Sequence, residues 1–445
     1  MMKLIAIDMG STYVKCAVLQ SHNNIMLEKQ VRPMPGKLPL SEKERFELPA
    51  EEIYLLVREM LDDCLERHSD VQAVFLDTQM HGYILTEPDG TCAENYISWQ
   101  DTLAEPLLPE LAERLGQTAL QHMGTRFKAG LAVCSFYARH KEQPLLHNKL
   151  LHTLGGYIFY RLSEGMGHIC HESMAASLGL YDCAAHTWNE QTLQAIGGQN
   201  LILPQIIPHT QKAGTYRGIP LYGDIGDHQA SVYGLDTAEA HSIILTLGTA
   251  GILCMPSVKP FFEGMEGRPF FHERWLLTKT RQPGGRTLDL LIDFMCSCGE
   301  MVTGQKLSVQ QLWQVLLEEI PEQTQGLRVK PDYFIGTGQG VIQGIGAVNF
   351  TPRLLFAAAI DGLAQTHAQA IEEFQRIEPG LQKILLCGGR LAKLERLRRS
   401  LERYTGLQVV CSQKQDEALY GLAKLAAELE ATPDYKKMMK QIEER

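Results

Sequence analysis

The chain has 445 residues, 44% of them apolar, and this length and composition predict a globular protein of two or three domains. Lys and Arg total 42 against 52 Asp and Glu, which gives a formal net charge of -10. Because a negatively charged chain does not attract polyanions, neither nucleic acid nor an anionic membrane surface is an expected partner.

The 11 cysteines are odd in number and contain no Cys-x-x-Cys pair, which predicts reduced thiols rather than disulfides. We interpret Cys296 and Cys298, the close pair, as structural, because a zinc site needs further ligands. The apolar run before Asp8 is too short for a signal peptide, and no later stretch approaches the roughly 18 apolar residues of a membrane span. We therefore expect a soluble, cytoplasmic protein.

The first residues predict a strand at 3–7, a small-residue turn at Gly10, Ser11 and Thr12, and a second strand at 13–19 that carries Lys15. Such a turn can direct backbone N–H groups toward phosphate oxygens. The carboxylate of Asp8 at the strand end is suited to Mg2+, directly or through water. An ordinary hairpin turn explains the pattern equally well, and a Walker motif is absent.

A helix predicted at 50–68 and a strand at 71–76 continue this α/β unit. Further on, Gly226 and Asp227 follow a glycine-rich turn and precede a small-residue segment that ends at Gly234. A carboxylate at such a junction can accept the proton of an attacking hydroxyl. A helix cap is the alternative interpretation of Asp227.

The second half repeats the design of the first. A strand predicted at 242–247 stops at Gly248 and Thr249, which begin another turn suited to phosphate or to a simple hairpin. The recurrence predicts two related halves with a boundary near residue 238. A helix at 352–374 and a strand at 383–387 then lead to Gly388 and Gly389, whose bare backbone suits a flat adenosine. The predicted elements that follow are a helix at 394–404, a stop at Gly406, a strand at 407–411 and a helix at 417–430.

In one chain, Asp8, Asp227 and the two glycine turns occur in an order that predicts assembly around a triphosphate, and hence phosphoryl transfer. These motifs resemble those of the FGGY family of carbohydrate kinases, within the actin/hexokinase superfamily, from residue 4 to about residue 427. The residues that carry the resemblance form six ordered motifs: Asp8 to Lys15, Gln79-Met80-His81-Gly82, Trp99-Gln100-Asp101, Gly226 to Gln229, Gly248 to Gly251, and Gly388-Gly389-Arg390.

The resemblance implies an α/β fold of two ribonuclease-H-like domains with an interdomain cleft. Residues 1–238 would form the sugar-binding N-terminal domain, and 239–445 the nucleotide-binding C-terminal domain. ATP and Mg2+ are the implied cofactors and a small sugar the implied substrate, with a homodimer as the candidate assembly. Asp227 would act as general base, and Asp8 would position Mg2+ and the substrate.

The same resemblance assigns binding roles to individual residues. Nucleotide contacts are implied for Gly10, Ser11, Thr12, Lys15, Gly248, Thr249, Gly285, Gly388 and Gly389. Sugar contacts are implied for Gln79, Met80, His81, Trp99, Asp101 and Glu172. Two positions depart from the usual pattern, because Glu172 stands where relatives often carry Asp and Pro283 where they commonly carry Asn.

Within the family, the stretches around Trp99 and Asp227 resemble sedoheptulokinases most, and xylulokinases next. Residues 336–340 replace a motif typical of xylulokinases. We therefore expect a ketose substrate, with sedoheptulose ahead of xylulose and other ketoses or polyols of the family as alternatives. An actin-like ATPase and an inactive sugar sensor remain the alternatives from other functional classes.

Overall fold

The computed structural model describes the chain apart from residues 24, 40–41, 142–147, 236–240, 334–338, 413, 434 and 436–445. The chain forms two compact units, of which the first comprises Met1–Asp236, Pro256–Leu277 and Lys414–Arg445. The second comprises Thr237–Met255 and Thr278–Gln413. The division at residue 238 into sugar-binding and nucleotide-binding domains stays a prediction, and most of the motif at 336–340 lies outside the described residues.

The first unit is built on a six-stranded sheet in the order β13-β14-β5-β1-β2-β3. Strands β1, β2 and β3 form an antiparallel meander, whereas β5 and β14 run parallel to β1. The strands are β1 (Lys3–Met9), β2 (Tyr13–Gln20), β3 (Met26–Pro33), β5 (Ala73–Thr78), β13 (Gly214–Tyr216) and β14 (Ile219–Gly226).

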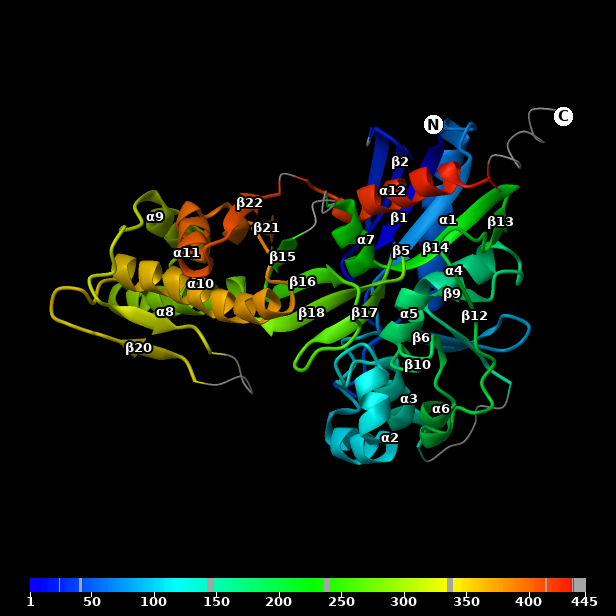
Figure 1. Ribbon diagram of the computed structural model, residues 1–445, viewed down its shortest axis with the longest axis horizontal. Helices are drawn as coiled ribbons and strands as arrows, with labels where there is room; N and C mark the ends of the chain where they lie inside the picture. The colour runs from blue at the N-terminus through cyan, green and yellow to red at the C-terminus, as the bar shows by residue number, and fades with distance from the viewer. Residues whose placement is uncertain are drawn as a thin grey trace. The chain divides into compact units, whose positions relative to one another are not determined.

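Helices flank this sheet (Figure 1), and alternate residues of its strands face opposite sides of it. Ile5 and Ile7 of β1 join the core beneath α1 (Ala50–Arg67) and α4 (Leu154–Leu162). Leu4 and Ala6 join the opposite core, which is covered by α12 (Glu417–Ala431), and α12 packs on α7 (Asp227–Gly234). Residues that continue the alternation begun by Leu4 and Ala6 therefore lie on the face of the sheet that α12 and α7 cover.

A four-stranded sheet in the order β4-β7-β6-β8 is inserted into the first unit. It packs with α2 (Leu108–His122) and α3 (Ala132–His140) around a separate apolar core that includes Tyr83 and Phe136. Its strands are β4 (Glu47–Leu48), β6 (Tyr83–Thr86), β7 (Cys92–Ile97) and β8 (Leu150–His152). The unit also contains smaller elements: η1 (Glu105–Leu107), α5 (Glu172–Ser177), α6 (Glu190–Ala195), β9 (Ile169–His171) paired with β12 (Gln205–Ile207), and β10 (Tyr181–Asp182) paired with β11 (Thr187–Trp188).

The second sheet has the order β17-β18-β16-β15-β21-β22 and repeats the connectivity of the first. Strand β15 forms an antiparallel hairpin with β16 and runs parallel to β21, as β1 does with β2 and β5. The strands are β15 (Ser242–Leu247), β16 (Gly251–Ser257), β17 (Glu266–Phe270), β18 (Arg274–Gln282), β21 (Lys383–Gly388) and β22 (Gln408–Cys411). This repetition confirms the predicted α/β class.

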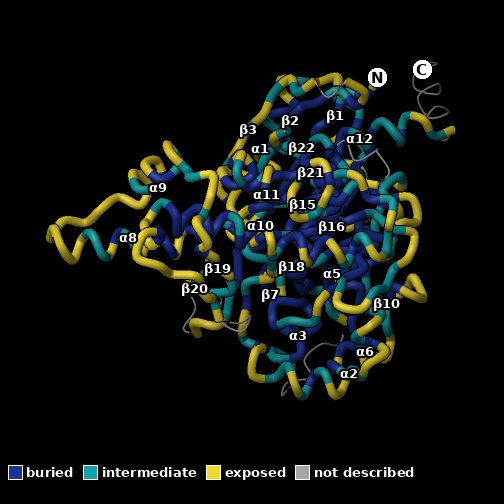
Figure 2. Tube along the Cα trace, turned by 60° about the vertical axis from the view of Figure 1, so that its left-hand side comes forward, coloured by how far each residue is buried: buried dark blue, intermediate teal, exposed yellow. Residues whose placement is uncertain are grey.

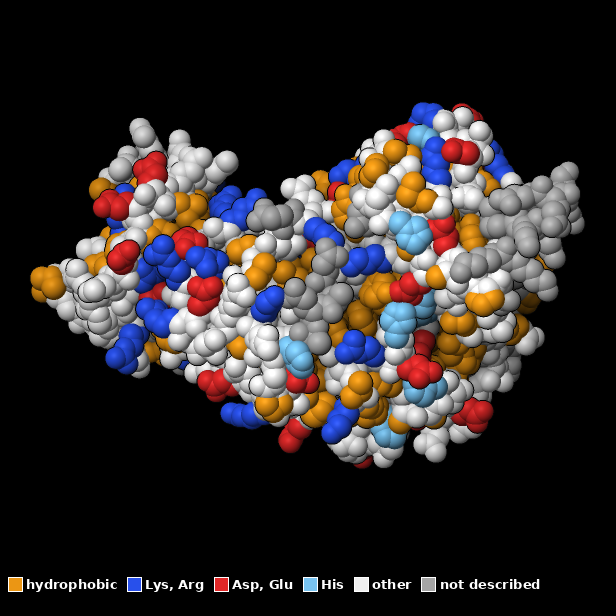
Figure 3. Space-filling view, turned by 45° about the horizontal axis from the view of Figure 1, so that its top comes forward, with side chains coloured by type: hydrophobic (Ala, Val, Ile, Leu, Met, Phe, Trp, Pro, Cys, Tyr) orange, Lys and Arg blue, Asp and Glu red, His pale blue; other side chains and the backbone are white. Residues whose placement is uncertain are grey.

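The remaining elements are the helices α8 (Gly285–Thr303), α9 (Val309–Glu318), α10 (Pro352–Ile377), η2 (Leu391–Lys393) and α11 (Glu395–Thr405), and the paired strands β19 (Arg328–Lys330) and β20 (Val341–Gln343). Figure 2 shows that the inner strands of both large sheets, such as β1, β5 and β15, are mostly buried, whereas α9 is largely exposed. On the face drawn in Figure 3, basic and acidic side chains are interspersed. Gly406 ends α11 with a φ of 71°, which confirms the predicted left-handed stop.

All 11 cysteines lie in the described part of the chain, and none of them forms a disulfide. In the described part of the chain, no helix is both long enough and apolar enough to cross a membrane.

Candidate active site

A row of charged side chains crosses three strands of the first sheet. Asp8 on β1 is opposite Lys15 on β2 and opposite Asp77 on β5. Side-chain alternation places all three on the α7 face. The Lys15 ammonium donates to Asp8 Oδ2 at 2.9 Å and lies 3.4 Å from Asp416 Oδ1. Lys15 therefore interacts with two carboxylates. The nucleotide contact expected of Lys15 stays a prediction.

Asp77 has no exposed surface, and neither of its carboxyl oxygens has a hydrogen-bond partner of good geometry in the described chain. Burial, followed by the charges of Asp8 and Asp227, raises the pKa of Asp77 well above its usual value. Asp77 was not among the site residues predicted from the sequence. A signal was present, because Asp77 directly follows a predicted strand just as Asp8 does.

Asp227 is the first residue of α7, immediately after β14 ends at Gly226. Its Oδ1 accepts a hydrogen bond from the N–H of His228 at 2.7 Å. Burial, and secondly the negative charge of Asp8, raises the pKa of Asp227 to about 7. The structure therefore brings Asp8 and Asp227, which are 219 positions apart, close enough for their charges to interact.

The turn between β1 and β2 is a tight hairpin, which is the alternative to a phosphate-facing turn that the sequence left open. Gly10 N–H donates to the carbonyl of Tyr13 at 3.0 Å, and Thr12 accepts from Met34 N–H at 2.9 Å. Ser11 and Thr12 are exposed. The hairpin is thus open to a ligand at its tip, and a phosphate contact by Gly10, Ser11 or Thr12 stays a prediction.

The segment after β5 carries the predicted sugar contacts Gln79, Met80 and His81, all of them buried. His81 has a φ of 78°, unusual for a residue with a side chain, and its Nδ1 lies 2.9 Å from the Ser177 carbonyl. Gln79 has no partner for either side-chain polar atom within the described residues. A Cβ on Gly82 would lie 2.5 Å from the Tyr96 ring, so only glycine fits there.

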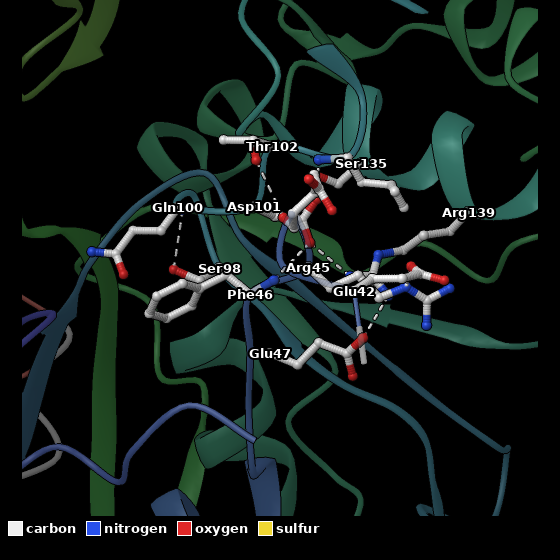
Figure 4. A network of polar contacts seen from close by, with 12 residues as sticks. Glu42, Arg45, Phe46, Glu47, Ser98, Gln100, Asp101, Thr102, Ser135 and Arg139 are labelled. Atoms are coloured by element: carbon white, nitrogen blue, oxygen red, sulfur yellow. Dashed lines mark hydrogen bonds and ion pairs between the residues drawn. The ribbon is translucent and has the colours of Figure 1, made fainter. Parts of the chain in front are cut away.

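The two predicted contacts of the following loop differ in exposure. Trp99 is 39% exposed, whereas Asp101 has no exposed surface. Asp101 Oδ2 accepts from Arg139 Nη2 at 2.7 Å and from the Phe46 N–H at 3.0 Å (Figure 4). Its Oδ1 accepts from the N–H of Leu103 at 3.2 Å. Both carboxylate oxygens of Asp101 therefore accept hydrogen bonds from protein groups. The buried side chain anchors the loop of residues 98–103, here called the Trp99 loop.

Glu172 begins α5 and is also engaged by the protein. Its Oε1 accepts from Tyr181 Oη at 2.8 Å and lies 2.7 Å from His186 Nδ1. The side chain is 28% exposed. A sugar contact by Glu172 stays a prediction.

An ion pair that the sequence did not indicate lies beside Asp227. Arg268 donates to Glu266 Oε2 through Nε at 3.0 Å and through Nη2 at 2.7 Å, and both residues are nearly inaccessible. Arg268 Nη1 also lies 3.1 Å from His228 Nδ1. Burial, then the charge of Arg268, lowers the pKa of His228 to about 3, which keeps the imidazole neutral.

In the second unit, the turn after β15 packs against the start of α8. The N–H groups of Gly285 and Arg286 donate to the carbonyls of Gly248 and Thr249 at 2.8 and 3.2 Å. Gly388 has a φ of 121° and is opposite Leu247 at the end of β15.

Gly389 is exposed, and a Cβ added to it would meet no atom within 4 Å. Leu391, which follows these glycines, lies 3.7 Å from a Cβ position on Gly285. Gly248, Thr249 and Gly285 therefore lie together in this unit, with the segment that follows Gly388 and Gly389 beside them. Pro283 precedes this start of α8, and its carbonyl lies 2.9 Å from a Cβ position on Gly251.

Among the described residues, no three His, Cys, Asp or Glu side chains are grouped so that they could hold a metal ion by themselves. Mg2+ does not require such a group, because it keeps several waters and commonly uses one or two carboxylates with substrate phosphates. The unsatisfied carboxyl of Asp77 beside Asp8 is a donor set of the hard oxygen type that this ion prefers.

Comparison with known proteins assigns the chain to a family. The model of the FGGY family of carbohydrate kinases, N-terminal domain, matches residues 3–233, just over half of the chain. The chain belongs to the FGGY family of carbohydrate kinases. This FGGY chain is 24% identical over 286 residues to glycerol kinase 2 of Streptomyces coelicolor, a match that covers 57% of the chain and 53% of that relative. The chain therefore spans about half the length of the curated relatives it matches.

Solved structures extend the likeness in fold to nearly the whole FGGY chain. A xylulose kinase from Lactobacillus acidophilus superposes with a TM-score of 0.82 at 16% identity, covering 97% of this chain and 90% of that one. Glycerol kinase from Plasmodium falciparum with ADP gives 0.81 at 15% identity, with 97% and 90% coverage. These similarities establish the predicted two-domain α/β fold and leave the substrate open.

Proposed function

We propose that this protein is an ATP-dependent carbohydrate kinase that transfers the γ-phosphate of Mg-ATP to a sugar hydroxyl. The observation that carries the proposal is the convergence of Asp8 and Asp227, with the pKa of Asp227 raised to about 7 by burial and by Asp8. A carboxylate poised near neutral pH is an effective general base for a hydroxyl. Asp227 then accepts the hydroxyl proton as the oxygen attacks the γ-phosphorus and ADP leaves.

The buried polar atoms around Asp227 favour a polyhydroxylated acceptor. In the described chain, side-chain atoms of Asp77, Gln79, His228 and Gln229 are buried without a hydrogen-bond partner. A Cβ on Gly226 would lie 2.5 Å from Gln229 Oε1 and 3.0 Å from Met80 Cε, so the start of α7 and the Gln79 segment adjoin. Buried polar atoms are normally satisfied, and sugar hydroxyls are suitable partners for both donors and acceptors.

Mg2+ fits the carboxylates of the first unit, and in this proposal Asp8 holds it directly or through water. When bound, the ion neutralises charge that develops on the phosphates. Gly10, Ser11, Thr12 and Lys15 contact phosphates from residues 1–238, while Gly248, Thr249, Gly285, Gly388 and Gly389 bind the nucleotide from residues 239–445. The exposed tip of the first hairpin and the association of Gly248 and Thr249 with the start of α8 support these roles.

For the acceptor we propose a ketose, with sedoheptulose preferred over xylulose, and xylulose over glycerol. The resemblance around Trp99 and Asp227 supports this order. The relatives and neighbours include glycerol kinases, xylulose kinases and a gluconate kinase, so the family spans several acceptors. A site built for a longer sugar leaves polar groups unpaired when a shorter one binds, at a cost of about 1 to 3 kcal/mol per group.

A coupled ADP-release assay with sedoheptulose, xylulose, ribulose, gluconate and glycerol tests both levels of the proposal. We expect ADP release that depends on Mg2+ and is stimulated by a ketose. Release that is independent of any sugar would indicate an actin-like ATPase, and sugar binding without turnover would indicate a sensor. A highest kcat/KM for glycerol or gluconate would overturn the ketose assignment and leave the kinase assignment intact.

A further inference from the structure

Strand β14 contains a bulge three residues before the proposed base. Gly223 is opposite Leu76 of β5, but Ile225 is opposite Asp77, so Asp224 is the extra residue in β14. Its φ of 59° lies in the left-handed region, which Asp tolerates better than most residues with side chains. Bulges of this kind redirect the chain that follows them.

The side chain of Asp224 is held by the start of α4, which adjoins β14 in the first unit (Figure 1). Asp224 has no exposed surface, and its Oδ2 accepts a hydrogen bond from Thr153 Oγ1 at 2.8 Å. Thr153 is the N-cap of α4 and also accepts from the N–H of Gly156 at 3.0 Å. A Cβ on Gly155 would lie 2.5 Å from Asp224 Oδ1, so the two elements pack without space to spare.

The segment between the bulge and the base is held a second time. The N–H of Gly226 donates to Ser173 Oγ at 3.1 Å, and the N–H of Ser173 donates to His171 Nδ1 at 3.2 Å at the start of α5. The starts of two helices thus fix residues 224 and 226. Because side chains alternate along a strand, loss of the bulge would shift the register by one residue and direct the following side chain to the other face.

We propose that Asp224 is a positioning residue for Asp227: its contact with Thr153 holds the β14 bulge that directs Asp227 toward Asp8. This inference rests on the proposed role of Asp227 as general base. Asp224 itself touches no substrate in this scheme. Its removal should therefore reduce kcat while leaving the binding of sugar and nucleotide nearly unchanged.

Three substitutions at this position separate the backbone from the side chain. Asp224→Asn keeps an acceptor for Thr153 and tolerates the left-handed backbone, so we expect kcat within about threefold of wild type. Asp224→Ala lacks the acceptor for Thr153 and tolerates the left-handed backbone poorly. It should reduce kcat by about ten- to a hundredfold, with the KM for sugar and the KM for nucleotide each within about twofold. Asp224→Gly tolerates the left-handed backbone but lacks the acceptor, so its kcat should lie between those of Asp224→Asn and Asp224→Ala.

Thr86→Val is the matched control, because Thr86 is equally buried and its hydroxyl lies 2.9 Å from His152 Nε2, outside the proposed site. This variant should lower the melting temperature without reducing kcat per folded molecule. If Asp224→Ala fails to fold, Asp224→Gly and Thr153→Val decide the question, and both should reduce kcat. A kcat within twofold of wild type in folded Asp224→Ala or Asp224→Gly, or equal losses in the control, would overturn the inference.

Hydrogen exchange of the peptide carrying residues 222–230 follows the bulge without any turnover. Protection should fall in Asp224→Ala and recover in Asp224→Asn. If the wild type phosphorylates no sugar but exchange behaves as expected, the proposed function fails and the role of the bulge contact survives. Unchanged protection in Asp224→Ala would reject the role of that contact directly.

Discussion

Arg139 provides a quantitative test of the polar network beneath the Trp99 loop (Figure 4). Its side chain is 4% exposed, donates to Glu47 Oε1 at 2.6 Å and Asp101 Oδ2 at 2.7 Å, and lies 3.6 Å from Glu94 Oε1. Replacing Arg139 by Met keeps most of the apolar volume but leaves buried carboxylates without their cation. Removing one partner of such a buried pair costs about 3 to 5 kcal/mol.

Because two closely bound carboxylates lose the same cation, we expect a loss near the upper end of that range, a large fraction of the roughly 5 to 15 kcal/mol that stabilises a typical domain. Urea unfolding followed by circular dichroism measures the loss by linear extrapolation. Arg353→Met is the matched control, because Arg353 is 35% exposed, with its Nη1 3.9 Å from Glu319 Oε2 and donating to the Glu319 carbonyl at 2.8 Å. This exposed pair should contribute less than about 1 kcal/mol.

A second substitution identifies the cause of the loss. In Arg139→Met, adding Asp101→Asn removes one unpaired charge and should recover part of the stability. The reasoning is refuted if Arg139→Met loses no more stability than Arg353→Met, or if the added Asp101→Asn destabilises the variant further.

Three further measurements address the site and the pH dependence. Asp227→Asn should reduce kcat by about two to four orders of magnitude while ADP affinity, measured by calorimetry, stays near wild type; turnover within threefold would remove Asp227 as the base. Asp8→Ala should lose activity that extra Mg2+ only partly restores, and an unchanged Mg2+ dependence would exclude the metal role. Burial lowers the pKa values of His171 and His367 from 6.5 to about 3 and about 4, so the stability that these neutral rings contribute is complete above pH 6.5 and is lost as the pH falls toward 4. The contribution of each histidine to the free energy of unfolding, measured as the difference between the wild type and a variant with that histidine replaced by Phe, should then drop by about 2 kcal/mol between pH 7 and 5, and a pH-independent difference would contradict this.

The strands and helices predicted around Asp8 and Gly248 and after residue 352, together with both glycine turns, followed from local pattern, whereas the inserted four-stranded sheet and its helices were not predicted. The apolar run that stops at Gly248 predicted the end of β15 at Leu247, because a glycine ends a buried strand, whereas β1 continues two residues beyond its apolar run, through Asp8 to Met9. The stop at Gly406 was equally local, since glycine alone adopts the left-handed backbone without strain. The resemblance to the family rested on six short motifs that occur in order along the chain.

The partners of those residues could not be predicted from the sequence. Asp77 meets Asp8 only because β5 pairs with β1, and Arg268 reaches His228 from a strand 40 positions further along the chain. No local pattern encodes such contacts, since they depend on which strands become neighbours. The sugar contact expected of Asp101 stays a prediction, and only the tertiary structure shows that protein groups engage both of its oxygens.

By itself, the sequence therefore determined the repeated α/β design, the positions of Asp8 and Asp227 at the ends of strands, and membership of a kinase family. Only the tertiary structure decided which carboxylates interact and how strongly burial shifts the pKa of Asp227. Only the folded chain showed that Asp224 forms a bulge before that base. The physical reason is that pKa values and backbone register depend on neighbours in space, whereas strand ends and turns depend on neighbours in sequence.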